Sequence, residues 1–333
     1  MPGRSVEPLT GTTRQLHPWV AEGQKRARFA IVSVFLSEWK EVLRFALRAE
    51  KLGFDAYWAN DHPNRSMDTW TFLSALAMAT ERIRLISLVS CIYYRSPLLI
   101  ARQAADVDRI SEGRLVLGIG IGDDVPEFNQ MCLPFPPVAQ RQEAMEEALS
   151  VVQGLWTEET FSFEGKYFRL DQARLSPKPV QQPHVPILIG GGGERVTLRQ
   201  VARFADVSNF APHEWSGSAF DISDVQRKYS ALRAHCEAVG RAYDSVLRSH
   251  YTPLLTLAEN EDDLERKRRD ARIPDRQLRS VPVFATPETA IAHYQALADA
   301  GVQYFLATIN GRDDETVRLF AEAVVPAVKL GPR

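Results

Sequence analysis

Strand-like and helix-like segments alternate along nearly the whole chain, and this alternation constrains the fold more than any other feature of the sequence. Short apolar runs rich in β-branched residues are typical of buried strands, whereas apolar residues spaced three to four positions apart are typical of helices. The clearest helix is predicted over residues 140–156, with apolar residues at 144, 148, 151, 152 and 155. Eight strands are predicted, at residues 29–35, 54–59, 83–91, 114–119, 185–189, 205–209, 247–257 and 302–309.

Alternating strand–helix units imply a parallel sheet, and eight such units imply an α/β fold of the (β/α)8 TIM-barrel type. A doubly wound sheet is the alternative, but sheets of this length usually show a break between halves, and no linker divides this chain. We expect insertions after strands four, six and seven, and a β-hairpin over 161–170 that turns at Glu164-Gly165. Residues 1–27 lack periodicity and are predicted to form an N-terminal arm, partly ordered at best, before a single domain at 28–330.

The composition narrows the classes of function. The chain has 333 residues and a formal net charge of −2, so no overall positive field favours nucleic acid. No stretch approaches the roughly 20 apolar residues of a membrane span, and the N-terminus lacks the apolar core of a signal peptide. Cys91, Cys132 and Cys236 are far apart, and the histidines lack metal-ligand spacing. We therefore expect a cytoplasmic protein without a structural metal.

Four consecutive glycines, Gly190, Gly191, Gly192 and Gly193, join predicted strand five to a helix expected from Glu194 onward. Such a junction leaves backbone N–H groups unpaired at a helix N-terminus, and the missing Cβ atoms allow close approach of a phosphate. The spacing matches neither a Walker A loop nor a GxGxxG fingerprint. A tight turn without a ligand is the alternative. Because four glycines are a costly way to build a plain turn, we predict an anion-binding site here.

The C-terminal ends of the strands carry the active site in a TIM barrel. This rule selects Asp61 and His62 after strand two, residues 87–91 in strand three, Asp123 after strand four and Asn209 after strand six. An acid beside an imidazole can accept and donate protons near neutral pH. A structural aspartate that caps a loop is the alternative for Asp61, and ordinary turn chemistry is the alternative for Asp123.

Two further strands carry residues with less specific patterns. On strand seven, Arg248 and His250 could bind an anion, and a surface position is an equally good interpretation. Cys91 has no histidine near it in the sequence, so a nucleophilic role is the less favoured interpretation.

Several motifs together resemble the bacterial luciferase-like TIM-barrel superfamily over about residues 28–325, and the chain is identified as a member. The motifs are Gly53-Phe54-Asp55, Asp61-His62, Tyr94-Arg95-Ser96-Pro97, the run 101–114, Gly118-Ile119-Gly120-Ile121-Gly122, Glu127-Phe128, Leu133-Pro134-Phe135-Pro136 and the run 189–194.

The resemblance also divides the possible activities by cofactor. One branch of the superfamily consists of FMN monooxygenases that use oxygen, often with Glu-His-His after strand two. The other uses the deazaflavin coenzyme F420, and Asn60-Asp61-His62 is similar to that branch. Asp123 falls where the F420-dependent sugar-phosphate dehydrogenases place a catalytic glutamate, one methylene longer. The resemblance therefore implies F420-dependent hydride transfer, with His62, oriented by Asp61, or else Asp123 moving the accompanying proton.

Further expectations come from the same resemblance. Members of the F420 branch have a non-prolyl cis peptide bond at the end of strand three, which would fall at Ser87–Leu88 here. Ser90 resembles a hydroxyl residue that contacts the cofactor, and the glycine run resembles the cradle for the cofactor phosphate. The implied cofactor-binding residues are Asp61, Ser87, Leu88, Ser90, Asp123, Gly190, Gly191, Gly192, Gly193 and Asn209.

The identity of the substrate stays open at this level, among alcohols, sugar phosphates and activated double bonds. Members of the superfamily are often homodimers, which we also expect here. Two alternatives to the F420 oxidoreductase remain, an FMN-dependent two-component monooxygenase and a homologue that binds a cofactor or ligand without catalysis.

Overall fold

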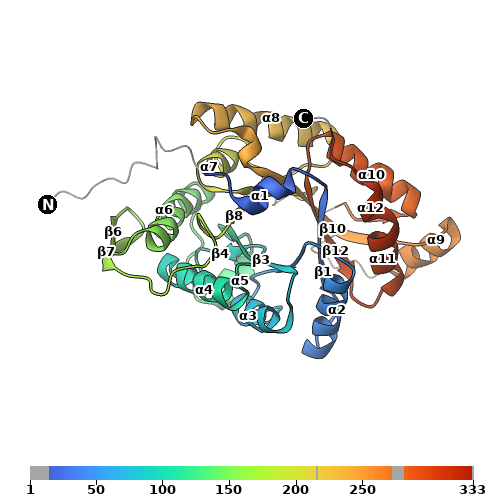
Figure 1. The fold of residues 1–333 in the computed structure, drawn as a ribbon, viewed down its shortest axis with the longest axis horizontal. Coiled ribbons are helices and arrows are strands. Elements are labelled where there is room, and N and C mark those ends of the chain that lie inside the picture. The colour runs from blue at the N-terminus through green and yellow to red at the C-terminus, as the bar shows by residue number, and fades with distance from the viewer. Residues whose placement is uncertain (1–14, 215–216, 272–280, 332–333) are drawn as a thin grey trace.

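The strands close into a barrel in the computed structural model, which describes residues 15–214, 217–271 and 281–331. Strand β1 (Arg28–Val34) pairs in parallel with β2 on one side and with β12 on the other, so the sheet closes on itself. Figure 1 shows helices surrounding this ring. The predicted (β/α)8 barrel is confirmed. The other barrel strands are β2 (Ala56–Ala59), β3 (Arg84–Ser87), β5 (Leu115–Gly120), β8 (Ile187–Gly190), β9 (Val207–Phe210), β10 (Leu247–Leu257) and β12 (Tyr304–Asn310).

The outer helices pack one apolar face each against the barrel, as their periodicity predicts. In α2 (Trp39–Lys51), for example, the buried residues are Phe45, Ala46 and Ala49, which share one face. The last helical segment is divided, because a π-helical stretch over Phe320–Val324 separates α11 from α12. The other helices around the barrel are α3 (Thr69–Ala79), α4 (Pro97–Ile110), α6 (Val138–Thr157), α7 (Thr197–Phe204), α8 (Ile222–Ala238), α10 (Pro287–Asp299), α11 (Asp314–Leu319) and α12 (Val325–Ala327).

The predicted insertions are present after the fourth, sixth and seventh barrel strands. The fourth carries α5 (Val125–Gln130) and, beyond α6, the antiparallel hairpin of β6 (Phe161–Glu164) and β7 (Arg169–Ala173). A loop over 211–221 follows β9, and part of it lies outside the described residues. Beyond β10 come α9 (Glu261–Asp270) and β11 (Val283–Ala285), which extends the sheet beside β10.

The third predicted strand is not continuous. Strand β3 ends at Ser87, β4 (Ser90–Cys91) resumes the pairing with β5, and the Leu88–Val89 peptide bond between them is cis. The cis bond therefore lies one residue after the predicted Ser87–Leu88 position, and that prediction is wrong. Ser87 stays in the sheet because its hydroxyl donates to the Gly118 carbonyl at 2.9 Å and accepts from the Gly118 N–H at 3.0 Å.

A short helix, α1 (Pro18–Gly23), covers the N-terminal end of the barrel. Its Trp19 is 2% exposed and packs edge-on against Tyr304 at the start of β12, with the Arg84 guanidinium 5.1 Å from its ring centre. The described part of the predicted arm thus has a helix that the lack of periodicity did not predict, while residues 1–14 lie outside the described residues. With this end covered, the strand ends opposite α1 are the open face of the barrel.

The cap of α1 makes the stability of the fold depend on pH. His17 is buried, and its Nδ1 accepts a hydrogen bond from the Trp19 N–H at 3.1 Å, so the ring must be neutral. Burial lowers the pKa of His17 from 6.5 to about 4. The unfolded chain therefore binds a proton between pH 6.5 and 4 that the folded chain does not, and the free energy of unfolding is expected to fall as pH falls through this window.

This expectation is tested by urea unfolding of the parent and of His17→Asn at about pH 7.5 and about pH 5. Asparagine can cap the helix without titrating, so the variant should lose less stability than the parent on acidification. His250, a second buried histidine, titrates equally in both proteins and cancels in the comparison. Equal losses in the two proteins would contradict the role of His17.

Within the described residues, no helix is both long and apolar enough to cross a bilayer. Across the same residues, no group of three histidine, cysteine, aspartate or glutamate side chains is placed to hold a metal ion.

Candidate active site

The predicted site residues come from different strands and lie at the same end of the barrel, opposite α1. Asp61 and His62 follow β2, residues 87–91 span the break between β3 and β4, and Asp123 follows β5. The glycine run follows β8, and Asn209 lies in β9. The strand-end rule thus selected residues from one region, although the partners of these residues differ from those expected.

His62 is held by a buried glutamate from the insertion after β5. The His62 Nδ1 lies 2.9 Å from Oε2 of Glu127, and the Tyr94 hydroxyl donates to the same oxygen at 2.7 Å. The Glu127 side chain is fully buried, whereas 21% of the His62 side chain is exposed. A carboxylate accepts hydrogen bonds, so this contact places the proton of neutral His62 on Nδ1 and makes Nε2 the accepting nitrogen.

Tyr94 remains a hydrogen-bond donor in this arrangement. Burial, and then the bond to Glu127, hold the pKa of the Tyr94 phenol well above its usual value. A protonated Tyr94 and the Nδ1–H of His62 therefore share one carboxylate oxygen, which fixes the orientation of the imidazole.

Asp61 does not orient His62, contrary to the prediction. Its Oδ2 accepts hydrogen bonds from the Arg95 guanidinium at 2.7 Å, the Cys91 N–H at 3.1 Å and the Ser90 hydroxyl at 3.3 Å. Adjacent residues of an extended segment point in opposite directions, so Asp61 and His62 reach different partners. Asp61 thereby ties the end of β2 to β4. Its other oxygen, Oδ1, is buried without a hydrogen-bond partner among the described residues.

The two acids after β5 differ in environment. Asp124 is buried, caps α5 by accepting from the Glu127 N–H at 3.1 Å, and pairs with Arg65. Asp123 is exposed and lies within electrostatic range of Cys91. Asp123 is therefore the acid of this pair whose side chain can meet a ligand. Burial raises the pKa of the Cys91 thiol to about 12, which keeps it protonated and disfavours a nucleophilic role.

The break between β3 and β4 presses Val89 against three glycines of neighbouring strands. A Cβ atom at Gly120 would lie 2.5 Å from the Val89 side chain, and one at Gly190 would lie 3.0 Å from it. At Gly118 the conflict is with backbone, since a Cβ would lie 1.8 Å from the Ser87 carbonyl oxygen. The glycines of β5 and β8 therefore make room for the Leu88–Val89 bulge over the open end of the barrel.

Several predicted cofactor contacts are instead engaged within the protein. Ser87 and Ser90 are fully buried, with their hydroxyls bonded to Gly118 and Asp61 respectively. The Asn209 amide donates to the Ser249 hydroxyl at 2.8 Å. These side chains bond neighbouring elements of the site, which the motif resemblance alone did not reveal. Leu88 is partly buried and lies in the bulge itself.

The glycine run forms a turn, but the helix after it starts later than predicted. Gly191 has a φ of +121°, and its N–H donates to the Asn209 carbonyl at 2.8 Å. Helix α7 begins at Thr197 rather than at Glu194. A Cβ at Gly192 would lie 2.9 Å from the Gly217 Cα, so the loop after β9 packs directly against this turn.

A buried lysine donates a hydrogen bond to the backbone of the glycine turn. The Lys228 Nζ donates to the Gly192 carbonyl at 2.9 Å and lies 3.6 Å from the Glu194 carboxylate. Lys228 comes from α8 and is 5% exposed. Neither Lys228 nor Glu127 was assigned a role from the sequence, because each reaches the site from an insertion or helix far along the chain. The Glu127-Phe128 motif was the available signal for the second of them.

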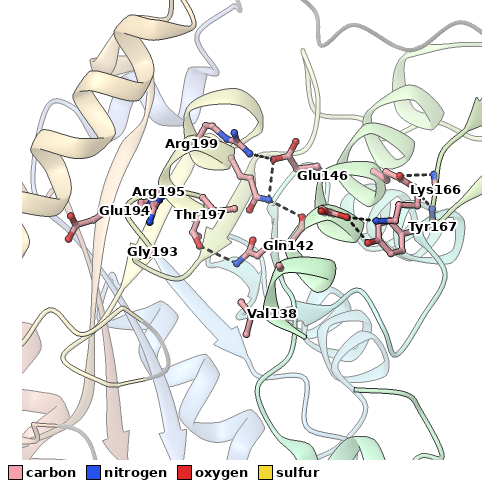
Figure 2. A pocket seen from close by; sticks show the side chains of 15 residues that line it. Val138, Gln142, Glu146, Lys166, Tyr167, Gly193, Glu194, Arg195, Thr197 and Arg199 are labelled. Carbon is pink, nitrogen blue, oxygen red and sulfur yellow. Dashed lines mark hydrogen bonds and ion pairs between the residues drawn. The ribbon is translucent and has the colours of Figure 1, made fainter. Parts of the chain in front are cut away.

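A cavity of about 800 Å³ borders the glycine turn between α6, α7 and the β6–β7 hairpin. Figure 2 shows Arg199 and Lys166 each bonded to a neighbouring carboxylate, whereas Arg195 has no such contact with the side chains drawn. Arg199 bonds Glu146 at 3.1 Å, and Lys166 bonds Glu143 at 2.8 Å. Arg195, two residues after Gly193, is exposed and is the nearest cation to the turn in sequence.

The fold and these groups define an enzyme-like TIM barrel whose polar residues gather at the strand ends. The model of the luciferase-like monooxygenase family matches residues 16–308, and the chain belongs to this family. Its members include oxidoreductases that use F420 and monooxygenases that use FMN.

Curated relatives of both kinds are similar to the chain. An F420-dependent glucose-6-phosphate dehydrogenase of Kineococcus radiotolerans is 28% identical over 86% of this chain and 92% of its own length. A pyrimidine monooxygenase of Allorhizobium ampelinum is 32% identical over 67% of this chain and 58% of its own length. An uncharacterized protein of Mycobacterium tuberculosis is 32% identical over 56% of this chain, and the match spans 62% of its length.

Solved structures share the fold at lower identity. An F420-dependent secondary alcohol dehydrogenase in complex with an F420–acetone adduct has a TM-score of 0.74 and 21% identity, over 91% of this chain and 99% of its own. A monooxygenase from Streptomyces bottropensis also has a TM-score of 0.74, with 23% identity, over 90% of this chain and 99% of its own. At this identity these likenesses support the fold alone.

Proposed function

We propose that the protein is an F420-dependent oxidoreductase that transfers a hydride between the deazaflavin and a small organic substrate. The observation that carries the proposal is His62, a partly exposed imidazole at the end of β2 whose Nδ1 is held by the buried Glu127 carboxylate. Such an imidazole can take a proton on Nε2 and return it, because the carboxylate stabilises the charged ring.

F420 is favoured over FMN by two features. The Asn60-Asp61-His62 motif is similar to the F420 branch, whereas the FMN branch often has Glu-His-His. The match to the F420-dependent dehydrogenase also extends over 92% of that protein, against 58% for the pyrimidine monooxygenase. A single histidine can remove one proton from a substrate. It therefore suits a substrate with a carbon-bound hydroxyl, such as a secondary alcohol or a sugar phosphate.

The residues present fit a planar cofactor with polar ring edges and a phosphate. The buried Asp61 Oδ1 has no partner among the described residues and can accept from an N–H group of a ligand. The turn over Gly190–Gly193, with Arg195 beside it, offers a place without side chains for a phosphate. When bound there, F420 would supply the acceptor or donor of the hydride.

Each residue then has a distinct part in the reaction. His62 accepts the hydroxyl proton of the substrate, Glu127 stabilises the resulting imidazolium, and Tyr94 fixes Glu127. Asp123, exposed at the end of β5, is the second candidate for the proton acceptor. The Leu88–Val89 bulge would form a wall of the cofactor site.

The proposal is tested by titrating the apoprotein with F420 and, separately, with FMN while following tryptophan fluorescence. Trp58 is buried inside the barrel, with 5.5 Å between its ring centre and that of Tyr251. It is a suitable reporter. We expect micromolar F420 binding and weaker FMN binding. The reverse order would support an FMN-dependent two-component monooxygenase, and binding of neither would support a non-catalytic homologue.

Two arginine variants show whether the glycine turn holds the phosphate. Arg195→Ala should raise the Kd for F420 about tenfold, because a charge-assisted hydrogen bond to the phosphate is lost. Arg199→Ala is the matched control, since its guanidinium is already bonded to Glu146. Equal effects of the two substitutions would place the phosphate elsewhere.

A further inference from the structure

An arginine of α6 bonds to both ends of the insertion that carries Glu127. The Arg141 Nε donates to the Pro136 carbonyl at 2.9 Å, and its Nη1 donates to the Ile121 carbonyl at 3.2 Å and to the Gly122 carbonyl. Ile121 and Gly122 follow β5, whereas Pro136 lies just before α6. One guanidinium therefore joins the start and the end of the segment over residues 121–136, which includes all of α5.

The same guanidinium is connected to Glu127 through a series of aromatic rings. Its central carbon lies 4.0 Å from the ring centre of Phe135. Phe135 packs edge-on against Phe128, with 4.8 Å between the ring centres, and the Phe128 ring centre lies 5.3 Å from that of Tyr94. Phe128 is fully buried, and the Tyr94 hydroxyl donates to Glu127. Arg141 thus packs against the rings that support the partner of the Glu127 carboxylate.

The start of this segment is packed closely against α5. Gly122 has a φ of +73°, and a Cβ atom there would lie 2.6 Å from the Phe128 side chain and 2.9 Å from the Cys91 Sγ. The Phe128 ring therefore lies directly against the backbone to which Arg141 bonds. Because Phe128 follows Glu127 in α5, the position of the Gly122 backbone and that of the Glu127 side chain are coupled.

The charge of Arg141 is buried against carbonyl groups rather than against a carboxylate. The residue is 4% exposed, and within the described residues no acidic side chain lies at ion-pair distance from it. A buried charge is costly unless its N–H groups are hydrogen-bonded. A guanidinium can bond three carbonyl groups at once because its five N–H groups form a fixed planar fork, which a lysine ammonium lacks. Arg141→Lys therefore keeps the charge and removes the connection between the two ends of the segment.

We infer that Arg141 is a positioning residue of the candidate active site, which holds the Glu127 carboxylate in place against the His62 imidazole. It acts through the backbone of residues 121–136, to which its side-chain hydrogen bonds go. The consequence for turnover rests on the proposed function, whereas the placement of Glu127 does not. Substitution of Arg141 should therefore affect the geometry of His62 and the chemical step more than it affects cofactor binding.

The placement is tested in the full-length apoprotein by ¹⁵N NMR of the histidine side chains, under conditions in which the ring of His62 is neutral. In the parent, His62 should carry its proton on Nδ1, because this nitrogen faces Glu127. In Arg141→Lys the displaced carboxylate no longer selects this tautomer, so the Nε2–H form should become the major one. His62→Asn identifies the His62 signals by their loss.

Arg114→Lys is the matched control. Arg114 also donates to backbone carbonyl groups, among them those of Thr80 and Ile83, but it lies just before β5 at the opposite end of the barrel. This substitution should lower the stability of the fold and leave the tautomer of His62 unchanged. A general loss of packing would instead affect His62 in both variants.

A second variant and an activity measurement complete the test. Phe135→Leu removes the ring between Arg141 and Phe128, so it should shift the tautomer of His62 in the same direction by a smaller amount. In turnover with F420, Arg141→Lys should lower kcat about 10- to 100-fold and leave the Kd for F420 within about twofold of the parent value. Arg114→Lys should leave kcat within about twofold of the parent value.

The outcomes separate this inference from the proposed function. An unchanged Nδ1–H tautomer in Arg141→Lys and in Phe135→Leu would overturn the inference, and so would an equal shift in Arg114→Lys. If Arg141→Lys does not fold, the tautomer in Phe135→Leu decides. A shifted tautomer in a protein without F420 turnover would contradict the proposed function and still support the placement of Glu127 by Arg141.

Discussion

Replacement of His62 by alanine is expected to lower kcat with F420 by about 10²- to 10⁴-fold. The loss arises because no other group of the His62–Glu127–Tyr94 arrangement can take a proton from the substrate at neutral pH. Affinity for F420 should change little, since the histidine acts on the substrate. The measurement is steady-state F420 reduction with the best substrate from a screen of secondary alcohols and sugar phosphates.

Three companion measurements distinguish proton transfer from a structural role. Added imidazole should partly restore the activity of His62→Ala, which a merely structural defect would not allow. Glu127→Gln should lower kcat by a smaller factor than His62→Ala, with little change in KM, because the amide still accepts from the imidazole but lacks the negative charge. Asp123→Ala tests the second candidate. If His62→Ala and Asp123→Ala both leave kcat within about threefold of the parent, the assignment of the proton-transfer group is wrong.

Replacement of Gly118 by alanine is expected to destabilise the protein by about 3 kcal/mol or more. The added Cβ would lie 1.8 Å from the Ser87 carbonyl oxygen, and backbone on both sides prevents a local adjustment. Gly240→Ala is the control, since Gly240 has a φ of +67° but nothing within 4 Å of its Cβ position. That substitution should cost only about 1–2 kcal/mol of left-handed backbone strain. Urea unfolding of both variants measures the difference.

A double substitution tests the packing of Val89 on the same glycines. Gly120→Ala brings its Cβ within 2.5 Å of the Val89 side chain, so Val89→Ala should recover much of the lost stability. The same second substitution should not rescue Gly118→Ala, whose conflict is with the Ser87 carbonyl. Equal destabilisation by Gly118→Ala and Gly240→Ala would contradict the close approach of β3 to β5.

The alternation of strands and helices was readable from the sequence because each element carries its own pattern. Strand β10 was predicted with the same bounds as in the structure, and the helix predicted over residues 140–156 is α6, which spans Val138–Thr157. The spacing of apolar residues within one segment is contained in the sequence of that segment. Local sequence information was therefore sufficient to predict these elements. The gathering of the candidate site residues at one end of the barrel followed from the same patterns, since parallel strands bring their C-terminal ends to one face.

The partners of the site residues were not readable in this way. His62 bonds Glu127, which is 65 residues away in the sequence, while Asp61 bonds Arg95 across 34 residues. The cis bond lies one residue after its predicted position, and the Ser87–Gly118 hydrogen bond beside it likewise joins two strands. The sequence by itself therefore determined the barrel, the order of its elements and the face at which the candidate site residues gather. Only the tertiary structure decided which polar groups meet, because that depends on distances between strands, helices and insertions that no local pattern encodes.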